Sequence, residues 1–278
     1  MKPLESSPPS SSPFLTSAYP PCPDQRPDAI LEQGRYLVRF ARDEAELRTI
    51  LQLRFQIFNL ELGEGLAESH ETGLDLDEFD PVCHHLLVLD RTSGEIVGTY
   101  RLQTNEMAAQ HRGFYSAGEF DLSVLPPEVS EHCVELGRAC ISLSHRNRQV
   151  LFLLWKGLAC YLAWNHKRYL FGCSSLTSQD PAEGKRMLDF LAARGHLHPS
   201  LVVPPLPGFE CAEITEAAEA AVENEGEIEV PSLFRSYLRY GAQICGPPAI
   251  DRAFKTIDFF MLFDLGGLDE RRFQLYFG

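Results

Sequence analysis

The chain of 278 residues lacks an excess of positive charge, because 25 Lys and Arg stand against 39 Asp and Glu, a formal net charge of −14. That balance argues against nucleic acid as a partner, since its phosphates require a basic surface. The eight cysteines include no C-x-x-C pair, and the nearest approach to a ligand cluster is Cys83 beside His84 and His85. We therefore expect no metal site. The longest apolar stretch, residues 150–164, holds a lysine and is shorter than the roughly 20 residues of a bilayer span.

The N-terminal end lacks an apolar run long enough for a secretory signal, and eight prolines fall within its first 27 residues. This composition is typical of a disordered segment, so we expect residues 1–30 to be a disordered Pro/Ser-rich tail. The remainder has enough apolar residues, 44% of the whole chain, to bury a core. We expect a cytoplasmic protein, and peripheral contact with the inner membrane face stays open.

The first half of the body has a strand, a helix and a hairpin in its pattern. Residues 35–43 alternate like a strand, and Asp43 is placed to cap an amphipathic helix that follows it. Residues 84–103 are typical of two strands joined by a turn at residues 92–94.

The second half predicts a βαβ-like unit. Residues 133–142 form a central strand, in which the interior Gly137 indicates a bulge or close approach by a ligand. A basic turn, an apolar helix near residues 150–166 and a buried strand at 169–176 follow, for which a parallel pair is expected. A helix should begin at Pro181, and a short helix and two strands should follow Pro231. No repeat is visible, so we expect one mixed α/β domain over residues 31–278.

An acidic insert interrupts this domain. Residues 210–229 contain eight glutamates and no Lys or Arg, so they supply −8 of the −14. We expect a solvated insert, and a partner-binding role is the alternative.

The order of predicted elements is similar to the GNAT N-acyltransferase fold, and short patterns resemble two branches that use fatty acyl groups on acyl carrier protein. The patterns that resemble acyl-homoserine lactone synthases are R-x-x-x-F at Arg54 and Phe58, D-x-x-D at Asp77 and Asp80, an arginine ending the hairpin at Arg101, and E-x-x-R at Glu135 and Arg138.

The second branch, the ornithine lipid N-acyltransferases often labelled hemolysin-like, is resembled more closely. GFYSAGEFDL, ELGRACIS, LLWKGLACYL and YLFGCSS carry this resemblance, which covers roughly residues 35–205. Lactone synthases have a tryptophan where this chain has Glu64, which argues against an S-adenosylmethionine pocket. The segment YLRYGAQICGPPAIDRAFKTIDF also resembles the hemolysin-like enzymes, so we favour the second branch.

The resemblance implies N-acylation by a thioester, which needs a base because an α-ammonium is mostly protonated at neutral pH. Glu135 is our candidate base, with Arg101 and Arg138 completing the predicted catalytic set; the alternative is that Glu135 forms a structural ion pair with one of these arginines. Backbone N–H groups of residues 137–140 would stabilise the oxyanion. A covalent intermediate on Cys140 is disfavoured because no histidine adjoins it.

The donor is expected to be acyl carrier protein carrying a phosphopantetheine thioester, or acyl-CoA, with no bound cofactor. Residues 145–149 read HRNRQ and lack the glycines that cradle a diphosphate. Arg146 and Arg148 suit a phosphopantetheine and an acidic carrier, or are merely solvated. The acyl and pantetheine set is Gly137, Ala139, Cys140, Arg146, Arg148, Phe152 and Trp155, although the last two could be ordinary core.

An acidic pocket would suit a diamino acid such as ornithine. From the acids between Asp77 and Asp121, which include Glu78 and Glu119, we select an acceptor set, although residues 75–80 could be only a charged loop. That set is Arg54, Phe58, Asp77, Asp80 and Asp121.

We expect an N-acyltransferase that moves a long, possibly 3-hydroxylated, acyl group to the α-amine of ornithine or a similar amino acid, giving a lyso-aminolipid. The alternatives are another acceptor, such as glycine, tyrosine, a polyamine or a lactone precursor, and a non-catalytic acyl-binding protein.

Overall fold

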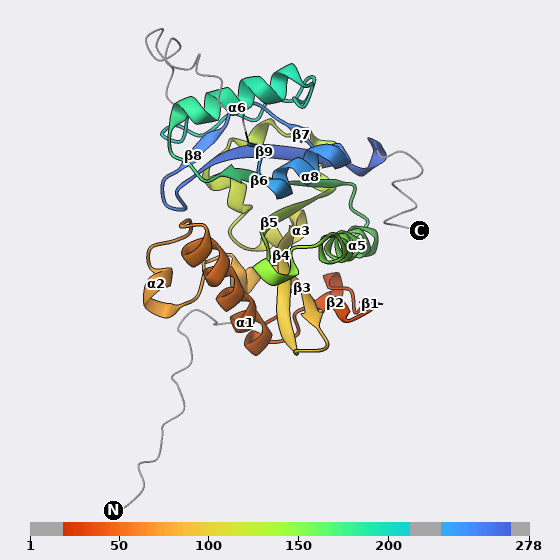
Figure 1. Ribbon diagram of the computed structural model, residues 1–278. Helices are drawn as coiled ribbons and strands as arrows, with labels where there is room; N and C mark the ends of the chain where they lie inside the picture. The colour runs from red at the N-terminus through yellow and green to blue at the C-terminus, as the bar shows by residue number, and fades with distance from the viewer. Residues whose placement is uncertain (1–18, 212–228, 268–278) are drawn as a thin grey trace, which may run out of the picture.

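A mixed nine-stranded sheet organises the part of the chain that the computed structural model describes, residues 19–211 and 229–267 (Figure 1). Its order is β1-β2-β3-β4-β5-β6-β9-β7, with β8 beside β9, and every pair is antiparallel except β5 with β6. The strands are β1 (Leu31–Gln33), β2 (Tyr36–Phe40), β3 (His84–Asp90), β4 (Glu95–Thr104), β5 (Cys133–Ile141), β6 (Tyr169–Leu176), β7 (Gln243–Ile244), β8 (Ala249–Asp251) and β9 (Thr256–Asp264).

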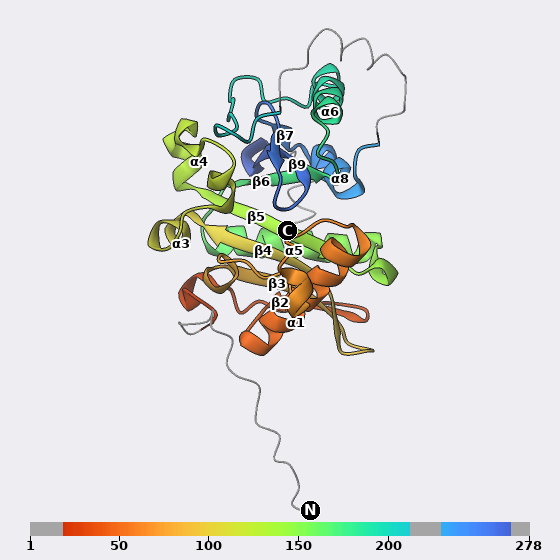
Figure 2. The same ribbon diagram turned by 90° about the vertical axis from the view of Figure 1, so that its left-hand side faces the viewer.

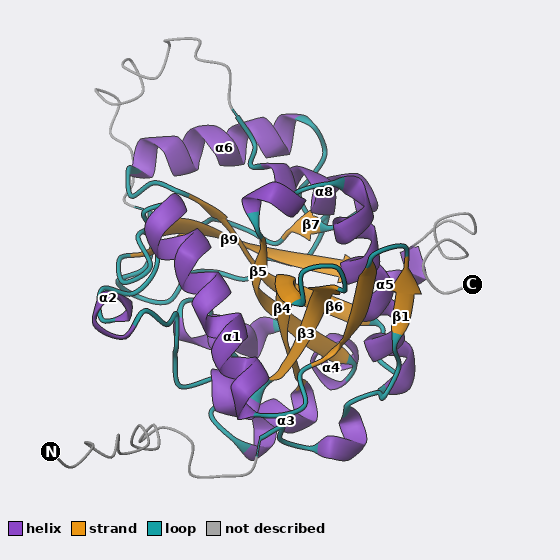
Figure 3. Ribbon diagram, turned by 60° about the horizontal axis from the view of Figure 1, so that its bottom comes forward, coloured by secondary structure: helices purple, strands orange, loops and turns teal. Residues whose placement is uncertain are grey.

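Helices flank both faces of the first half of the sheet, with α1 and α5 on opposite sides (Figure 3). The helices are α1 (Glu44–Phe55), α2 (Ser69–Thr72), α3 (Asn105–Gln110), α4 (Pro127–Glu131), α5 (Arg148–Trp164), α6 (Pro181–Ala193) and α8 (Ser232–Tyr240). Strand β3 has apolar residues on both of its faces, so each face needs a helix to cover it. Leu87 packs with α1, whereas Leu86 and Val88 pack with α5.

The second half of the sheet consists of β6, β9, β7 and β8, with α6 and α8 packed beside it (Figure 1). Phe234 of α8 and Met187 of α6 join Phe259 and Met261 of β9 in the same hydrophobic cluster that contains α5. The core is therefore continuous between the two halves.

The two halves separate after a short parallel pairing. Strands β5 and β6 pair only at residues 133–135 with 169–171, and no further pairing joins them within the described part of the chain (Figure 2). On its other edge β5 bulges, because Thr99 pairs with Cys140 but Arg101 pairs with Gly137, and Arg138 takes a left-handed φ of 49°. One edge of β5 beyond Glu135 is thus left without a neighbouring strand.

Most predicted elements are confirmed with shifted ends. The hairpin turns at Thr92 to Gly94, the β5–β6 pair is parallel, and Asp43 caps α1 by accepting the N–H of Glu46 at 2.9 Å. After Pro231 the chain forms three strands where we predicted two, because the segment before β9 contributes both β7 and β8.

The boundary of the predicted tail is wrong for its last part. Residues 1–18 lie outside the described residues, but Tyr19 and Pro27 are buried. Trp164 and Asn165 donate to the carbonyl oxygens of Asp24 and Gln25 at 2.9 Å. Residues 19–27 therefore pack against the body, since backbone acceptors and one aromatic ring suffice to hold a proline-rich segment.

The acidic insert lies mostly outside the described residues. Its two ends, Glu210 and Glu229, are described and are exposed. No helix in residues 19–211 or 229–267 combines the length and hydropathy required to cross a membrane.

Candidate active site

A cavity of about 640 Å³ opens where β5 and β6 diverge. Its walls include the free edge of β5, residues 136–141, and the facing residues 172–175 of β6. Both polar and apolar side chains line it. The polar side chains are linked by hydrogen bonds and ion pairs, and the apolar side chains pack against one another. The cavity thus offers a polar reaction site and an apolar compartment in one volume.

Glu135 lies at the point where the strands separate, and its side chain lines the cavity. Its two carboxylate oxygens accept the backbone N–H groups of Tyr115 and Ser116, each at 2.7 Å. Burial raises the pKa of Glu135, while these hydrogen bonds and the charge of Arg101 oppose that rise. Within the described residues it forms no ion pair with Arg101 or Arg138, so the predicted structural alternative is replaced by a backbone contact.

The three arginines of the predicted site converge on one loop. Arg54 of α1 is fully buried and bonds Asp75 at 2.7 Å and Asp80 at 2.5 Å. The described contacts that extend this network join Arg101 to Asp77 at 2.6 Å and to Asp80 at 3.2 Å, and Arg138 to Asp77 at 3.1 Å and to Asp75 at 3.5 Å. Three cations face three carboxylates, so the network ties α1, β4 and β5 to residues 75–80 at balanced charge.

These pairings use Asp77 and Asp80, two of the three aspartates that we predicted to bind the acceptor amine. Although burial opposes its charged form, Arg101 and Arg138 hold the pKa of Asp77 well below its usual range. Burial raises the pKa of Asp80 despite Arg54. Arg138 also lies over the rings of Tyr115 and Phe254, at 4.9 and 4.2 Å from their centroids. The network therefore fixes the β5 bulge beside the cavity.

The remaining residues of the predicted β5 set line the cavity along its free edge. They are Gly137, Ala139 and Cys140. Burial raises the pKa of the Cys140 thiol to about 12, which disfavours the thiolate that a covalent mechanism would need.

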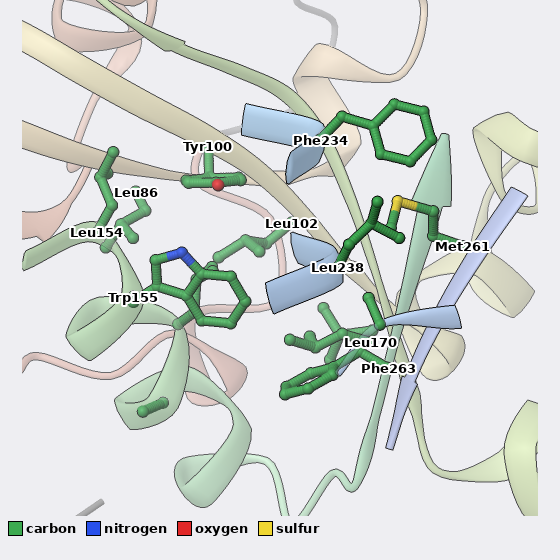
Figure 4. Close-up of a cluster of buried hydrophobic side chains, with 14 of the residues drawn as sticks. Leu86, Tyr100, Leu102, Leu154, Trp155, Leu170, Phe234, Leu238, Met261 and Phe263 are labelled. Carbon is green, nitrogen blue, oxygen red and sulfur yellow. The ribbon is translucent and has the colours of Figure 1, made fainter. Parts of the chain in front are cut away.

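Apolar side chains line much of the rest of the cavity, and Figure 4 shows several of them, among them Tyr100, Trp155, Leu170, Phe234 and Met261. Trp155 of α5 lies 4.7 Å from Tyr240 and 5.9 Å from Phe263, measured between ring centroids. Leu154, Leu170 and Met261 line the same volume. Trp155 is thus both core and cavity wall, whereas Phe152, which we predicted beside it, is not among the lining residues.

The cavity mouth carries the exposed arginines of the turn. Arg146 pairs with Glu61 and donates to the carbonyl oxygen of Ile141 at 2.9 Å, and Arg148 begins α5. The side chain of Asn147 accepts the N–H groups of Gln149 and Val150 at 3.0 Å. The first turn of α5 is therefore capped by its own chain.

Three buried acids near the cavity were missed or only partly recognised from the sequence. Glu64 and Asp258 line the cavity, and Glu119 lies beside Asp258 and Cys173, with ligand atoms of these three residues within 4.8 Å of one another. An acid within the apolar strand sequence TIDFFMLF is the signal that could have revealed Asp258, because an acid is rarely buried without a role.

Two further predicted residues have other surroundings. Asp121 caps a short turn by accepting from Ser123 at 2.6 Å and does not line the cavity. Phe58 does line the cavity, with its ring centroid 5.6 Å from that of Phe254.

Several solved structures of acyltransferases are similar to this chain. The AHL synthase LasI matches with a TM-score of 0.48 at 13% identity, over 88% of this chain and 97% of that protein. FeeM, an N-acyl amino acid synthase from uncultured soil microbes, matches with a TM-score of 0.47 at 9% identity, over 84% and 92%.

Sequence comparison gives the closer relationship. Residues 53–156 match the family model of the acetyltransferase (GNAT) domain. An L-ornithine N(alpha)-acyltransferase of Rhodobacter capsulatus is 33% identical over 87% of this chain and 94% of its own length. Its counterpart from Brucella abortus is 34% identical over 87% and 89%. The resemblance inferred from the motifs is confirmed: this chain is an acyltransferase of the GNAT fold and belongs to the L-ornithine N(alpha)-acyltransferase family.

Proposed function

We propose that this enzyme transfers a long-chain acyl group from the phosphopantetheine thioester of acyl carrier protein to the α-amine of L-ornithine, giving a lyso-aminolipid. The observation that carries the proposal is the gap between β5 and β6, which joins Glu135 and a free strand edge to an apolar cavity. The names of the relatives supply the acceptor.

The free edge of β5 supports thioester binding. Residues 137–140 line the cavity, and the edge of β5 away from β4 has no neighbouring strand there, so the N–H groups that point to this edge are available to the thioester oxygen. Fixed N–H donors stabilise a developing oxyanion without reorganisation in the transition state.

Glu135 acts as the general base. It takes one proton from the α-ammonium, and the neutral nitrogen then attacks the thioester carbon to form the C–N bond. The tetrahedral intermediate collapses with cleavage of the C–S bond. A second proton leaves the nitrogen and ends on the phosphopantetheine sulfur, while the first passes from Glu135 to solvent. Arg101 assists by favouring the carboxylate form of Glu135 against the effect of burial.

The cavity mouth favours a carrier protein over a diphosphate-bearing donor. The side chain of Asn147 accepts two N–H groups in the first turn of α5, and Arg148 adds positive charge beside them, whereas Arg146 is paired with Glu61. Leu143 is 69% exposed in the same segment. Positive charge around an exposed leucine suits the acidic surface of an acyl carrier protein.

The test is a direct assay with an acceptor panel. Purified full chain is incubated with palmitoyl- or 3-hydroxypalmitoyl-carrier protein and with ornithine, glycine, tyrosine or putrescine, and products are identified by mass spectrometry. N-acylornithine should dominate. Preferential acylation of another amine would replace ornithine as the acceptor, and the absence of any N-acyl product would contradict the proposed transfer.

A further inference from the structure

Four buried acids, two of which line the cavity, have no arginine or lysine of their own. They are Glu64, Glu119, Asp251 and Asp258, each at most 7% exposed. Among the described residues none of them forms a salt bridge, whereas the acids at positions 75, 77 and 80 all do. Buried carboxylates are normally paired, so this negative charge requires an explanation.

Hydrogen bonds account for two of the four. Asp251 accepts the N–H groups of Ala253 and Phe254 at 2.8 Å and the hydroxyl of Tyr115 at 3.2 Å. Glu64 accepts from the hydroxyl of Thr177. These two acids therefore have donors that fix them in place.

Glu119 and Asp258 form a hydrogen bond with each other, and Ser175 forms one with Asp258, but each acid keeps one oxygen without a donor. Glu119 Oε2 and Asp258 Oδ1 are buried and have no hydrogen-bond partner in the described structure. Asp258 is 4% exposed and lines the cavity. Burial raises the pKa of both acids, and together with the charge of Asp258 it raises that of Glu119 to about 10. The two groups therefore hold at least one proton between them at neutral pH, and the pair carries at most one negative charge.

Two residues, Ser116 and Cys173, connect the pair to the candidate base. Ser116 donates its N–H to Glu135 at 2.7 Å, and its hydroxyl lies 3.5 Å from the sulfur of Cys173. That sulfur is within 4.8 Å of carboxylate oxygens of both Glu119 and Asp258. Glu135 and Asp258 thus line the same cavity and are linked through Ser116 and Cys173.

We propose that Asp258, backed by Glu119, binds the side-chain ammonium of a short diamino acid while its α-amine faces Glu135. This assignment rests on the proposed function, because it presumes an amino-acid acceptor acylated at its α-amine. One ammonium is attracted by the negative charge of the pair and supplies the donors that Oε2 of Glu119 and Oδ1 of Asp258 lack. Acceptor selection then follows from a buried carboxylate that a neutral side chain leaves unpaired.

The test compares L-ornithine with L-norvaline, which has the same carbon skeleton without the side-chain amine. Binding is measured by calorimetry and acylation by mass spectrometry, with the wild-type chain, Asp258→Asn and the charge-matched control Asp189→Asn on the exposed face of α6. For the wild type, kcat/KM should be at least about 100-fold higher for ornithine than for norvaline, as expected for loss of a charged hydrogen bond in a buried site. Asp258→Asn should raise KM for ornithine by about 100-fold and leave norvaline within a few-fold. The control should match wild type for both.

Thermal midpoints and Glu119→Gln complete the design. If Asp258→Asn unfolds, the milder Glu119→Gln must still weaken the binding of ornithine more than the binding of norvaline. Selective ornithine binding that depends on Asp258 supports the inference even where no acylation occurs, and only the proposed reaction then fails. If the wild type acylates ornithine but Asp258→Asn lowers kcat/KM equally for both acceptors, the proposed reaction is supported and the inference is overturned. A zinc-dependent activity that Asp258→Asn abolishes would also overturn the inference, because these atoms would then be metal ligands.

Discussion

The carbonyl oxygen of Leu136 on β5 occupies the space into which a side chain on Gly172 of β6 would project. Leu136 is the first residue of β5 beyond its pairing with β6, so this contact marks the place where the two strands begin to diverge. A glycine is required because a Cβ atom would overlap the carbonyl oxygen.

Gly172→Ala should therefore disturb the gap between the strands. Backbone cannot yield as a flexible side chain would, so we expect a loss of about 1 to 3 kcal/mol in the free energy of unfolding. Turnover should fall as well, because the thioester edge of β5 moves. The matched control is Gly267→Ala, where a Cβ would meet nothing within 4 Å. Chemical denaturation and steady-state kinetics measure both effects, and a Gly172→Ala variant with wild-type stability and turnover would contradict this geometry.

Glu135→Gln should lower kcat by roughly 10² to 10⁴, the usual range for loss of a general base. It should also destabilise the chain by about 1 to 3 kcal/mol, because an amide has one acceptor for the two N–H groups of Tyr115 and Ser116. Stability alone cannot separate the roles, so the pH profile of wild-type kcat/KM is the discriminating measurement.

Only the carboxylate form of Glu135 accepts a proton, so activity should decline as pH falls through its raised pKa. The decline should begin at a higher pH than for an ordinary glutamate. Glu135→Asp, which keeps the charge, should retain this limb at reduced rate, and Glu135→Gln should lose it. A stable Gln variant with turnover within a few-fold of wild type would remove Glu135 from the mechanism.

Arg148→Glu should weaken recognition of the carrier protein. Reversal of an exposed charge at a rim acts mainly on association, so we expect KM for acyl-carrier protein to rise about tenfold with little change in kcat. Acyl-CoA turnover should change less, and the salt dependence should diminish. Arg186→Glu on α6 is the control. An equal effect of both variants on both donors would argue against a carrier site at the cavity mouth.

Acyl chain length should control kcat/KM. Each buried methylene contributes about 0.8 kcal/mol, so shortening a C16 chain to C12 should cost roughly 3 kcal/mol, or about 200-fold. Met261→Phe, which adds volume to the cavity wall, should shift the preference toward shorter chains. A chain-length series by mass spectrometry tests this, and equal losses at every length would show that the acyl chain lies elsewhere.

Glu119 should make stability depend on pH. Its pKa of about 10 in the folded chain is well above the value near 4.3 of an unfolded glutamate. The folded state therefore keeps a proton that the unfolded state releases, so the contribution of Glu119 to stability is greatest below about pH 4 and is lost as pH rises toward 10, by at most about 1.4 kcal/mol per pH unit. Urea unfolding at pH 6 and 9 should show a flatter dependence for Glu119→Gln than for Asp189→Asn. Identical slopes would contradict the raised pKa.

The local elements were predictable because their signals are local. Asp43 precedes an amphipathic pattern, and Thr92 to Gly94 separate two alternating segments, so cap and turn follow from neighbouring residues. The motif arginines were identified through resemblance, yet two of their partners, Asp77 and Asp80, were assigned to a substrate. Sequence spacing does not reveal which of two opposite charges is already paired in the fold.

The features that define the site depend on long-range packing. The separation of β5 from β6 depends on where β9 and α5 pack, and Gly172 alone does not indicate it. The position of Asp258 in the cavity was not predicted, because strand periodicity indicates burial but does not indicate which groups a buried acid faces. The packing of residues 19–27 likewise depends on Trp164 and Asn165, which lie 140 residues further along the chain.

The most direct measurement is the site of acylation on ornithine, determined by tandem mass spectrometry of the product formed from 3-hydroxypalmitoyl-carrier protein. With the α-amine at Glu135 and the side-chain ammonium held by Asp258, we predict an amide at the α-nitrogen and a free side-chain amine. An amide at the side-chain nitrogen, or no amide with any donor, would contradict the account.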